Sequence, residues 1–317
     1  PQRLREGRAT WGRRLGNGVD LLLSASTMRM RGEDRFFDYG AAGVADWARG
    51  LDGERARQFF ARVAGSEWSL DLVHGDRRKD DPTASFLSDP LVPGQFSSDR
   101  YTLLQGQRQA SLRGGELQLQ GRLFAGRYDY GSDLNYGTVF GFPGSTNWLG
   151  GELRLLYTGI AGHKLMLGAE WQDNRRADQF ILDQVDPAND RTIRSPSSRA
   201  GVYAQDEWLL ADGLNLTWGL RLDRGSGGDV ESSPRAGLIW QALPTTTLKL
   251  LYGRAHRAPN AYERDYDDGV SLIGNPALRG ETIDTLELVA DHRIGSDLLL
   301  RGAAYNWSMR DLVTLGI

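Results

Sequence analysis

The chain has 317 residues, of which 40 are glycine and none is cysteine. Glycine is well above the roughly 7 % of average proteins, and without cysteine no disulfide framework, thiolate metal site or cysteine nucleophile can form. The 38 basic and 41 acidic residues nearly balance, which argues against a nucleic-acid partner. No apolar run approaches the ~20 residues of a membrane-spanning helix. The composition therefore favours either a soluble β protein or a transmembrane β-barrel, in which apolar residues occupy alternate positions.

The two ends of the chain indicate a fragment. It begins at Pro1 with no initiator methionine and no apolar leader segment, and it stops at Leu315-Gly316-Ile317, just after an apparent strand. We therefore expect residues 1–317 to form one partial domain of a longer protein.

Helical patterns are scarce along the chain. The best helical candidate is 53–63, where the apolar residues are bunched at Phe59, Phe60 and Val63 between turn residues. Alternation with a period of two is far commoner, and it predicts strands with one apolar and one polar face. The clearest examples are 115–129, 163–173, 213–223, 246–254 and 282–290.

The connections between these strands alternate between short turns and long polar segments. Turn residues such as glycine, asparagine and proline favour tight hairpins, and they cluster at 15–18, 64–66, 113–115, 159–162, 211–213, 242–245 and 294–296. Long segments lie at about 32–53, 75–98, 129–146, 173–197, 224–232 and 255–281. Seven hairpins therefore share one rim of the predicted sheet, and six long loops share the other.

The strands, about fourteen in number and about 10–14 residues long, suit a membrane barrel better than a soluble sandwich. Their polar faces carry Glu, Gln, Arg and Asp, which would be costly in a packed apolar core but not in a water-filled lumen. Tryptophans near strand ends fit interfacial girdles, at positions Trp11, Trp68, Trp148, Trp171, Trp208, Trp240 and Trp307. The alternative is that they are core residues of a β-sandwich.

Enzyme signatures are missing. The four histidines are scattered without an H-E-x-x-H pair, and neither a G-x-S-x-G elbow nor a P-loop occurs. We therefore expect no catalysis, no bound metal and no cofactor.

The stretch from Ser232 to Val313 contains the most specific motifs of the chain. It reads Ser233-Pro234-Arg235-Ala236-Gly237, then Leu251-Tyr252-Gly253-Arg254-Ala255-His256-Arg257-Ala258-Pro259, then Gly274-Asn275-Pro276-Ala277-Leu278 with Glu281, and Thr285-Leu286-Glu287-Leu288. These motifs resemble those of TonB-dependent outer-membrane receptors, strongly in the last third of the chain and weakly elsewhere. Single motifs such as Gly274-Asn275-Pro276 are also ordinary turn chemistry.

The resemblance implies an all-β fold, namely a transmembrane antiparallel up-and-down β-barrel with short periplasmic turns and long extracellular loops. Receptors of this family have a 22-stranded barrel filled by an N-terminal plug that contacts TonB, and they end in an aromatic residue. By this comparison the chain supplies about fourteen of the strands and lacks the first strand or so, the plug and several of the last strands. We then expect the first and last strands to be unpaired edges of a curved sheet, unless fourteen strands close by themselves.

Candidate ligand-binding residues lie where strands leave the membrane on the long-loop side. A guanidinium suits carboxylate, catecholate or phosphate groups, although an ion pair with a loop acid such as Glu263 or Asp265 is the commoner role. The loop at 128–148 is rich in tyrosine and glycine, a composition that adapts to flat ligands. The candidates are Arg254, Arg257, Tyr262, Asp265, Asp267, Asp268, Tyr130 and Tyr136. The acidic cluster lacks the spacing of a calcium-binding EF-hand, so a solvated loop is the favoured interpretation.

The leading hypothesis is a receptor barrel in the outer membrane of a Gram-negative cell. By resemblance, its partners are outer-membrane lipid, TonB acting through the plug, and a scarce nutrient complex such as a ferric siderophore or cobalamin. Two alternatives stay open at this stage. One is a passive porin-like channel of fourteen strands, and the other is a soluble β-rich carbohydrate-binding protein or hydrolase.

Overall fold

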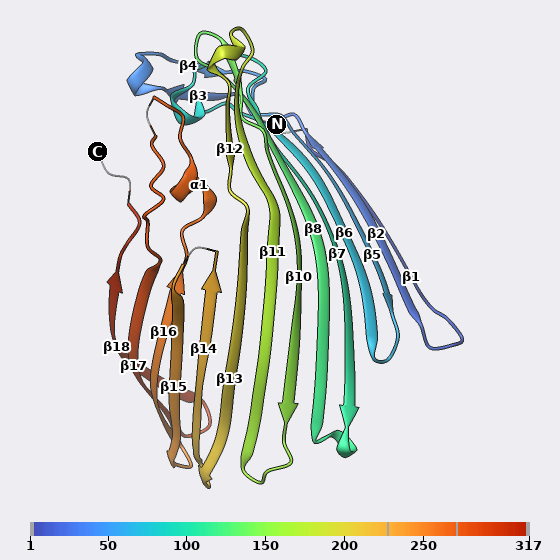
Figure 1. Ribbon diagram of the computed structural model, residues 1–317, viewed down its shortest axis with the longest axis vertical. Helices are drawn as coiled ribbons and strands as arrows, with labels where there is room; N and C mark the ends of the chain where they lie inside the picture. The colour runs from blue at the N-terminus through green and yellow to red at the C-terminus, as the bar shows by residue number, and fades with distance from the viewer. Residues whose placement is uncertain (1–2, 227, 271, 315–317) are drawn as a thin grey trace.

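The computed structural model describes residues 3–226, 228–270 and 272–314. Fourteen long strands follow one another in a single sheet (Figure 1). They are β1 (Arg5–Arg14), β2 (Asp20–Met30), β5 (Glu54–Ala64), β6 (Trp68–Asp80), β7 (Phe96–Leu112), β8 (Leu117–Asn135), β10 (Gly144–Tyr157), β11 (His163–Asp183), β13 (Ser197–Ala211), β14 (Leu214–Gly225), β15 (Val230–Leu243), β16 (Thr246–Arg257), β17 (Glu281–Ile294) and β18 (Leu298–Arg310).

Shorter elements lie at the rim that carries the long loops. β3 (Arg35–Asp38) and β4 (Ala45–Ala48) form a separate two-stranded sheet, and β9 (Val139–Gly141) and β12 (Arg191–Arg194) pair with the upper ends of β8 and β11. The helical elements are α1 (Ala261–Asp265) and short 3-10 turns at Gly40–Ala42, Ser85–Leu87, Arg113–Gly115 and Pro187–Asn189. None of the helices in the described part of the chain is long and apolar enough to span a bilayer.

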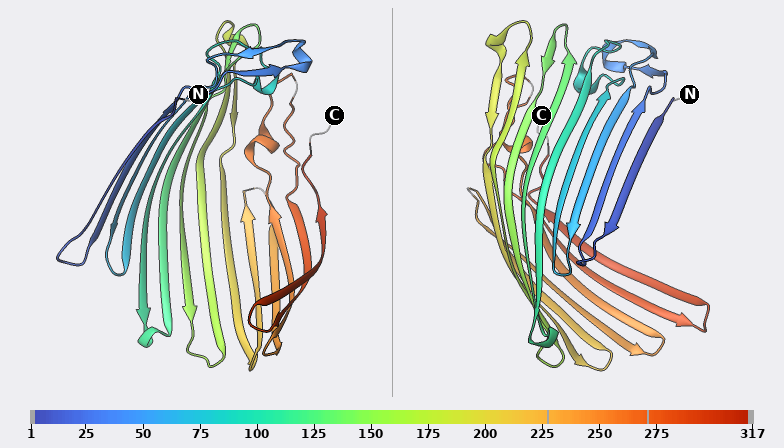
Figure 2. Two further views of the ribbon diagram at one scale, coloured as in Figure 1. Left: turned by 180° about the vertical axis from the view of Figure 1, so that it is seen from behind. Right: turned by 90° about the vertical axis from the view of Figure 1, so that its right-hand side faces the viewer.

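Each long strand pairs antiparallel with its neighbours in the sequence, and among the described strands β1 pairs only with β2 and β18 only with β17. The sheet therefore has two open edges, and it curves into a trough (Figure 2). This confirms the predicted partial up-and-down barrel. The fourteen described strands do not close on themselves, as a complete fourteen-stranded pore would.

The two rims differ as the turn chemistry predicts, because hairpins gather at one end and long connections at the other (Figure 1). Two details of the prediction were wrong. β14 ends at Gly225 and β15 begins at Val230, so the connection is shorter than the long segment expected at 224–232. The best helical candidate, 53–63, falls almost entirely in β5, because residues 54–63 pair one by one with both β2 and β6.

Several strands are also longer than the predicted 10–14 residues. β8 has 19 residues and β11 has 21, so both extend into segments that the sequence pattern assigned to loops. These extensions carry polar residues together with the buried apolar side chains Leu134 and Ile181. The residues 315–317, which lack the expected aromatic terminus, lie outside the described part of the chain.

The chain has almost no hydrophobic core. Among the described residues, the buried hydrophobic side chains are Ala48, Leu134, Ile181 and Val289. The accessible surface is 20545 Å², whereas a compact monomer of 35.1 kDa would expose roughly 13,000 Å² by the usual scaling. Leucines at alternate strand positions are half exposed, for example Leu123 at 69 % and Leu153 at 58 %. Such an apolar outer face belongs in lipid, which contradicts the soluble alternatives.

The inner face of the wall is polar and is packed by aromatic rings lying over glycines. A Cβ at Gly168 would stand 2.1 Å from the ring of Tyr203, and one at Gly126 would stand 2.1 Å from the ring of Trp148. The Tyr203 hydroxyl donates to Glu152 (3.0 Å), which also forms an ion pair with Arg122 (3.1 Å). Trp148 lines the hollow of the trough, so its predicted place in an outer aromatic girdle was wrong.

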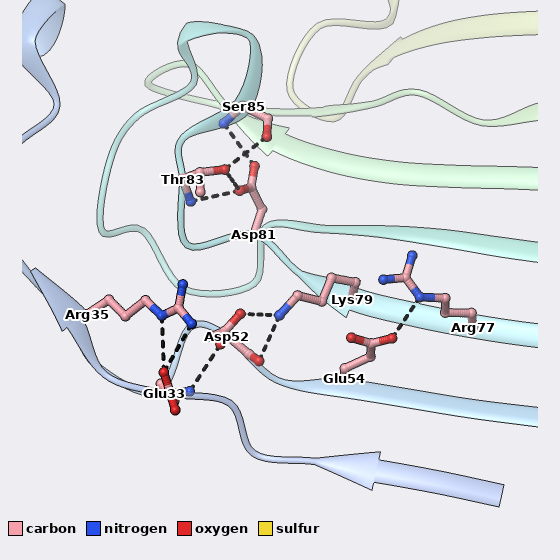
Figure 3. Close-up of polar contacts among 9 residues, drawn as sticks. All are labelled: Glu33, Arg35, Asp52, Glu54, Arg77, Lys79, Asp81, Thr83 and Ser85. Atoms are coloured by element: carbon pink, nitrogen blue, oxygen red, sulfur yellow. Dashed lines mark hydrogen bonds and ion pairs between the residues drawn. The ribbon is translucent and has the colours of Figure 1, made fainter. Parts of the chain in front are cut away.

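The first long loop is attached to the wall by a partly buried carboxylate (Figure 3). Asp52 accepts hydrogen bonds from the backbone N–H of Glu33 (3.0 Å) and from the Lys79 ammonium, which also donates to the Asp52 carbonyl (2.9 Å). Only 16 % of the Asp52 side chain and 23 % of the Lys79 side chain is exposed. The long connection between β2 and β5 is therefore attached at its base to β6.

Candidate functional site

The long-loop rim surrounds a hollow with a volume of 2220 Å³ on the concave side of the trough. Its wall comes from the upper ends of β8, β10, β11 and β13 to β17, and its top from the connections 84–95, 136–143 and 258–280. The strands are rigid and the connections vary in conformation, so a ligand here would meet a fixed wall and adaptable loops. This hollow is the candidate ligand-binding site.

Aromatic side chains form one part of the hollow. The rings of Tyr262 and Tyr266 lie 4.6 Å apart between centroids, and those of Tyr136 and Phe140 meet edge to face at 6.0 Å. Burial, with the nearby phenol of Tyr262 and the carboxylate of Asp268 adding to it, raises the pKa of Tyr266 to about 12. Burial also raises the pKa of Tyr136 and Tyr262. At neutral pH these phenols are therefore protonated, and they offer ring faces and O–H donors.

The loop from 258 to 280 is held in place by a clamp at Arg257. The guanidinium forms ion pairs with Glu281 (2.6 Å) at the start of β17 and with Glu263 (2.8 Å) in α1. Asn260 caps this helical turn by accepting from the Glu263 N–H (2.9 Å), while the Glu263 carboxylate accepts from the Asn260 N–H (2.9 Å). This reciprocal pattern is a capping box, which explains why a turn of helix forms here.

Arg254 is also engaged by the wall. Its guanidinium donates to Asp284 of β17 (2.8 Å), which accepts from Arg310 and from the Tyr252 hydroxyl as well. For Arg257 the alternative interpretation, an ion pair with the loop acid Glu263, is what the structure shows. Neither guanidinium is left without a carboxylate partner.

The predicted residues divide into two groups. Tyr130, Tyr136, Arg254, Tyr262 and Asp268 line the hollow together. Arg257, Asp265 and Asp267 do not line it. Asp265 instead forms an ion pair with Arg264 (2.7 Å), whose guanidinium lowers the pKa of that carboxyl against the effect of burial, and Asp267 accepts from the Gly269 N–H (2.7 Å).

Sequence reasoning missed other lining residues. Arg279 is exposed and, within the described residues, has neither an ion-pair nor a hydrogen-bond partner. Phe86 and Leu87 project into the hollow from a turn in which both residues have left-handed backbone (φ 56° and 62°), and they are 74 % and 82 % exposed. Arg279 follows Gly274-Asn275-Pro276-Ala277-Leu278 directly, so its place beside that motif was the available signal.

Across residues 3–226, 228–270 and 272–314, no group of three or more His, Asp or Glu side chains is arranged to hold a metal ion. The chemistry available in the hollow is therefore stacking on tyrosine and phenylalanine, hydrogen bonding from phenols, and charge pairing with a free guanidinium. These are means of binding a ligand.

A family model described as "TonB dependent receptor-like, beta-barrel" matches residues 10–315. The chain belongs to this family. As a TonB-dependent receptor barrel it is an outer-membrane protein, and its short hairpins mark the periplasmic rim and its long connections the extracellular rim.

Curated relatives of this receptor barrel match about half of the chain. The iron-regulated outer membrane virulence protein of Vibrio cholerae is 31 % identical over 160 residues, which are 49 % of this chain and 24 % of that protein. The ferric enterobactin receptor PirA of Pseudomonas aeruginosa is 30 % identical over 171 residues, which are 46 % of this chain and 23 % of that protein. The match therefore spans about a quarter of each relative.

Solved receptor structures share the fold over nearly the whole chain. A point mutant of the ferric enterobactin receptor PfeA from Pseudomonas aeruginosa superposes with a TM-score of 0.73 at 16 % identity, covering 96 % of this chain and 50 % of that one. The ferric yersiniabactin uptake receptor FyuA from Yersinia pestis gives 0.69 at 13 % identity, covering 97 % and 52 %. The receptor barrel described here thus spans about half the length of these receptors.

Proposed function

We propose that this chain forms part of the wall and binding mouth of a receptor that takes up a ferric siderophore in a TonB-dependent step. The observation that carries the proposal is the hollow, which is lined both by the paired rings of Tyr262 and Tyr266 and by Arg279, whose guanidinium has no partner among the described residues. The relatives described above carry the names of iron-regulated and ferric-siderophore receptors, which favours this substrate class over cobalamin.

The chemistry of a ferric catecholate fits these groups. Its catechol rings present flat faces, which stack against tyrosine at ring distances of 4.5–7 Å. The complex is also polyanionic, and arginine is the side chain best suited to bind delocalised oxygen anions. Tyr262 and Tyr266, held protonated by burial, bring no negative charge of their own against such a ligand.

Within this proposal the chain supplies binding and not energy coupling. The resemblance assigns coupling to the plug domain, on which TonB pulls. The Arg257 clamp would then keep the loop at 258–280 in a binding-competent position, because it ties that loop to β17 and to its own helical turn.

Binding to the purified protein tests the proposal directly. Quenching of tryptophan fluorescence would be titrated with a ferric tris-catecholate complex, with the iron-free catecholate and with cobalamin. We expect saturable binding of the ferric complex alone, weakened about tenfold by Arg279→Gln, since a hydrogen bond to a charged group contributes about 1.5–3 kcal/mol. Arg194→Gln is the matched control, because Arg194 is exposed at the same rim but does not line the hollow. Tighter binding of cobalamin than of the ferric complex would refute the proposed substrate class.

A further inference from the structure

A charged region lies on the opposite face of the wall, on the outside of β1, β2, β5, β6 and β7 (blue to teal-green strands in Figure 1). The hollow of the trough is lined by Tyr128, Tyr130 and Ser132 of β8, so the intervening Asp129 lies on the outer face, since successive strand residues point to opposite faces. Residues directly opposite one another share a face. The register therefore extends this outer row from Asp129 to Arg100, Asp76, Arg57 and Thr27.

The next outer row toward the extracellular rim consists of four arginines in direct registry. Arg5 lies opposite Arg29, Arg29 opposite Arg55, and Arg55 opposite Arg78. Directly opposite side chains have their Cβ atoms about 4.5–5.5 Å apart, and like charges at such positions destabilise a sheet. Four cations in one row therefore need a source of negative charge.

The protein itself supplies little of that charge. Arg100 is paired with Asp76 (3.1 Å), and Arg78 lies 3.7 Å from Asp80 with its guanidinium over the ring of Phe96. The other arginines of the two rows are exposed, and within the described residues they have no carboxylate partner. They are Arg5, Arg29, Arg55 and Arg57.

Three of these arginines share a groove. A depression of 670 Å³ is lined by the outward-facing residues Thr27, Arg29, Arg55, Arg57, Phe59, His74, Asp76 and Arg100, and also by Met28, Ala56 and Gln58. Its volume suits a headgroup rather than a single small ion. Asp76 is its one carboxylate, and that group is already occupied by Arg100.

The same outer face becomes apolar toward the periplasmic rim. The row that follows Thr27 and Arg57 is mixed, with Ala25, Phe59, His74 and Thr102. The row after it is apolar, with Leu23, Ala61, Leu72 and Leu104. Leu23 and Leu104 are 42 % and 47 % exposed, as residues facing acyl chains would be. Arg29 is six residues from Leu23, or about 20 Å along a strand. The groove thus lies where lipid headgroups of the extracellular leaflet meet the barrel.

We infer that this outer groove is a binding site for the phosphorylated headgroup of an outer-leaflet lipid such as lipid A. Guanidinium groups bind phosphate through paired N–H donors, and the adjoining apolar rows would pack against the acyl chains of the same molecule. The bound phosphates would also remove the repulsion within the arginine rows. This site is separate from the ligand-binding hollow and does not depend on the proposed substrate.

The test measures binding of diphosphoryl lipid A to protein that was purified from outer membranes and delipidated in detergent. We expect Arg55→Gln to weaken binding about fivefold, since each basic residue near an anionic lipid surface contributes about 1 kcal/mol. The matched control is Arg224→Gln. Arg224 is exposed near the same rim on β14, and its cross-strand neighbours, Ala200 and Val230, are uncharged.

The lipid-free protein gives a second readout of opposite sign. Without lipid, Arg55→Gln should leave the melting temperature unchanged or raise it, because a repulsive charge is removed. Lipid A should raise the melting temperature of the unsubstituted protein, and it should raise that of Arg55→Gln by less. Equal weakening by Arg55→Gln and Arg224→Gln would overturn the site. Two other results would show that the phosphorylated lipid is not the occupant of the groove. One is that inorganic phosphate saturates the groove at the same concentration as lipid A, and the other is that lipid without phosphates binds as tightly as lipid A.

Discussion

The carboxylate of Asp52 offers the sharpest test of how the extracellular rim is held together. Asp52→Ala removes the acceptor of the Glu33 N–H, and it removes the charge that faces the Lys79 ammonium (Figure 3). Lys79 would then keep only the Asp52 backbone carbonyl, at 2.9 Å. We expect the first long loop, residues 31–53, to detach from β6 while the wall itself stays folded.

The magnitude follows from the exposure of the two side chains. Losing a charge-assisted hydrogen bond to a backbone N–H costs about 1.5–3 kcal/mol. Breaking a fully buried ion pair costs about 3–5 kcal/mol, but with 16 % and 23 % of the side chains exposed the ion pair adds less than that here. A total of about 3 kcal/mol corresponds to a roughly 150-fold larger opening equilibrium of the loop. Asp52→Asn retains an oxygen for Glu33 and should lose about half of this free energy.

Hydrogen exchange of residues 33–53 measures this opening. Glu33→Gln is the control. Within the described part of the chain, the Glu33 carboxylate pairs only with Arg35 (3.0 Å), the two side chains are 39 % and 58 % exposed, and exposed pairs contribute under about 1 kcal/mol. If hydrogen-exchange protection falls equally in Asp52→Ala and Glu33→Gln, Asp52 is not the residue that holds the loop to β6. Unchanged protection in Asp52→Ala would lead to the same conclusion.

Three further predictions concern the rim, the hollow and the wall. Burial raises the pKa of Asp52 and Asp81, but hydrogen bonds to each carboxylate outweigh it and the net pKa is lowered. Their contribution is therefore present above the unfolded value of about 3.9 and lost as the pH falls through the folded value, so loop protection should be constant from about pH 7 to 5 and fall below about pH 4. Tyr266→Ala should weaken ferric catecholate binding about fivefold to tenfold and Tyr266→Phe much less, because the ring face carries the contact; equal losses in a fluorescence titration would contradict this. Gly168→Ala should lower the unfolding free energy by about 1–3 kcal/mol by displacing the Tyr203 ring, and it should be nearly neutral in a Tyr203→Ala background; an equal cost in both backgrounds would show that the ring is not responsible.

The sequence predicted the wall of this protein well because the bilayer imposes a strict pattern. A strand between lipid and water must alternate, and a hairpin turn needs specific residues, so both features can be read locally. The alternation in 213–223 and the turn at 211–213 correspond to β14 and to the hairpin before it. Antiparallel order followed from the short turns alone.

The rim was predicted poorly for the opposite reason. Beyond the membrane lipid no longer covers one face of a strand, so the period of two is lost. There β11 continues to Asp183 through the consecutive apolar residues Phe180, Ile181 and Leu182. Contacts between loops also depend on residues distant in the sequence. The ion pair of Arg257 with Glu263 could be predicted, because the two residues are only six apart in the sequence. The pair of Arg257 with Glu281 and the contact of Asp52 with Lys79 could not, because they depend on the strand register of the folded protein.

The same limit applies to the arginine rows on the outer face. Arg5, Arg29, Arg55 and Arg78 lie on four strands and are separated by two hairpins and a long loop, so nothing local marks them as neighbours. Register alone brings them into one row. Charge counts over the whole chain, with 38 basic and 41 acidic residues, conceal this concentration entirely.

The alternation of the wall also bears on how the chain reaches the outer membrane. Every outward leucine is followed by an inward polar residue in strands such as β14, so the unfolded chain has a mean hydropathy of only −0.46. A segment must be apolar over about 20 residues to be retained as a helix in a bilayer. An extended copy of this chain can therefore pass through the inner membrane without being held there, and it becomes lipophilic only when pairing sorts its side chains onto two faces.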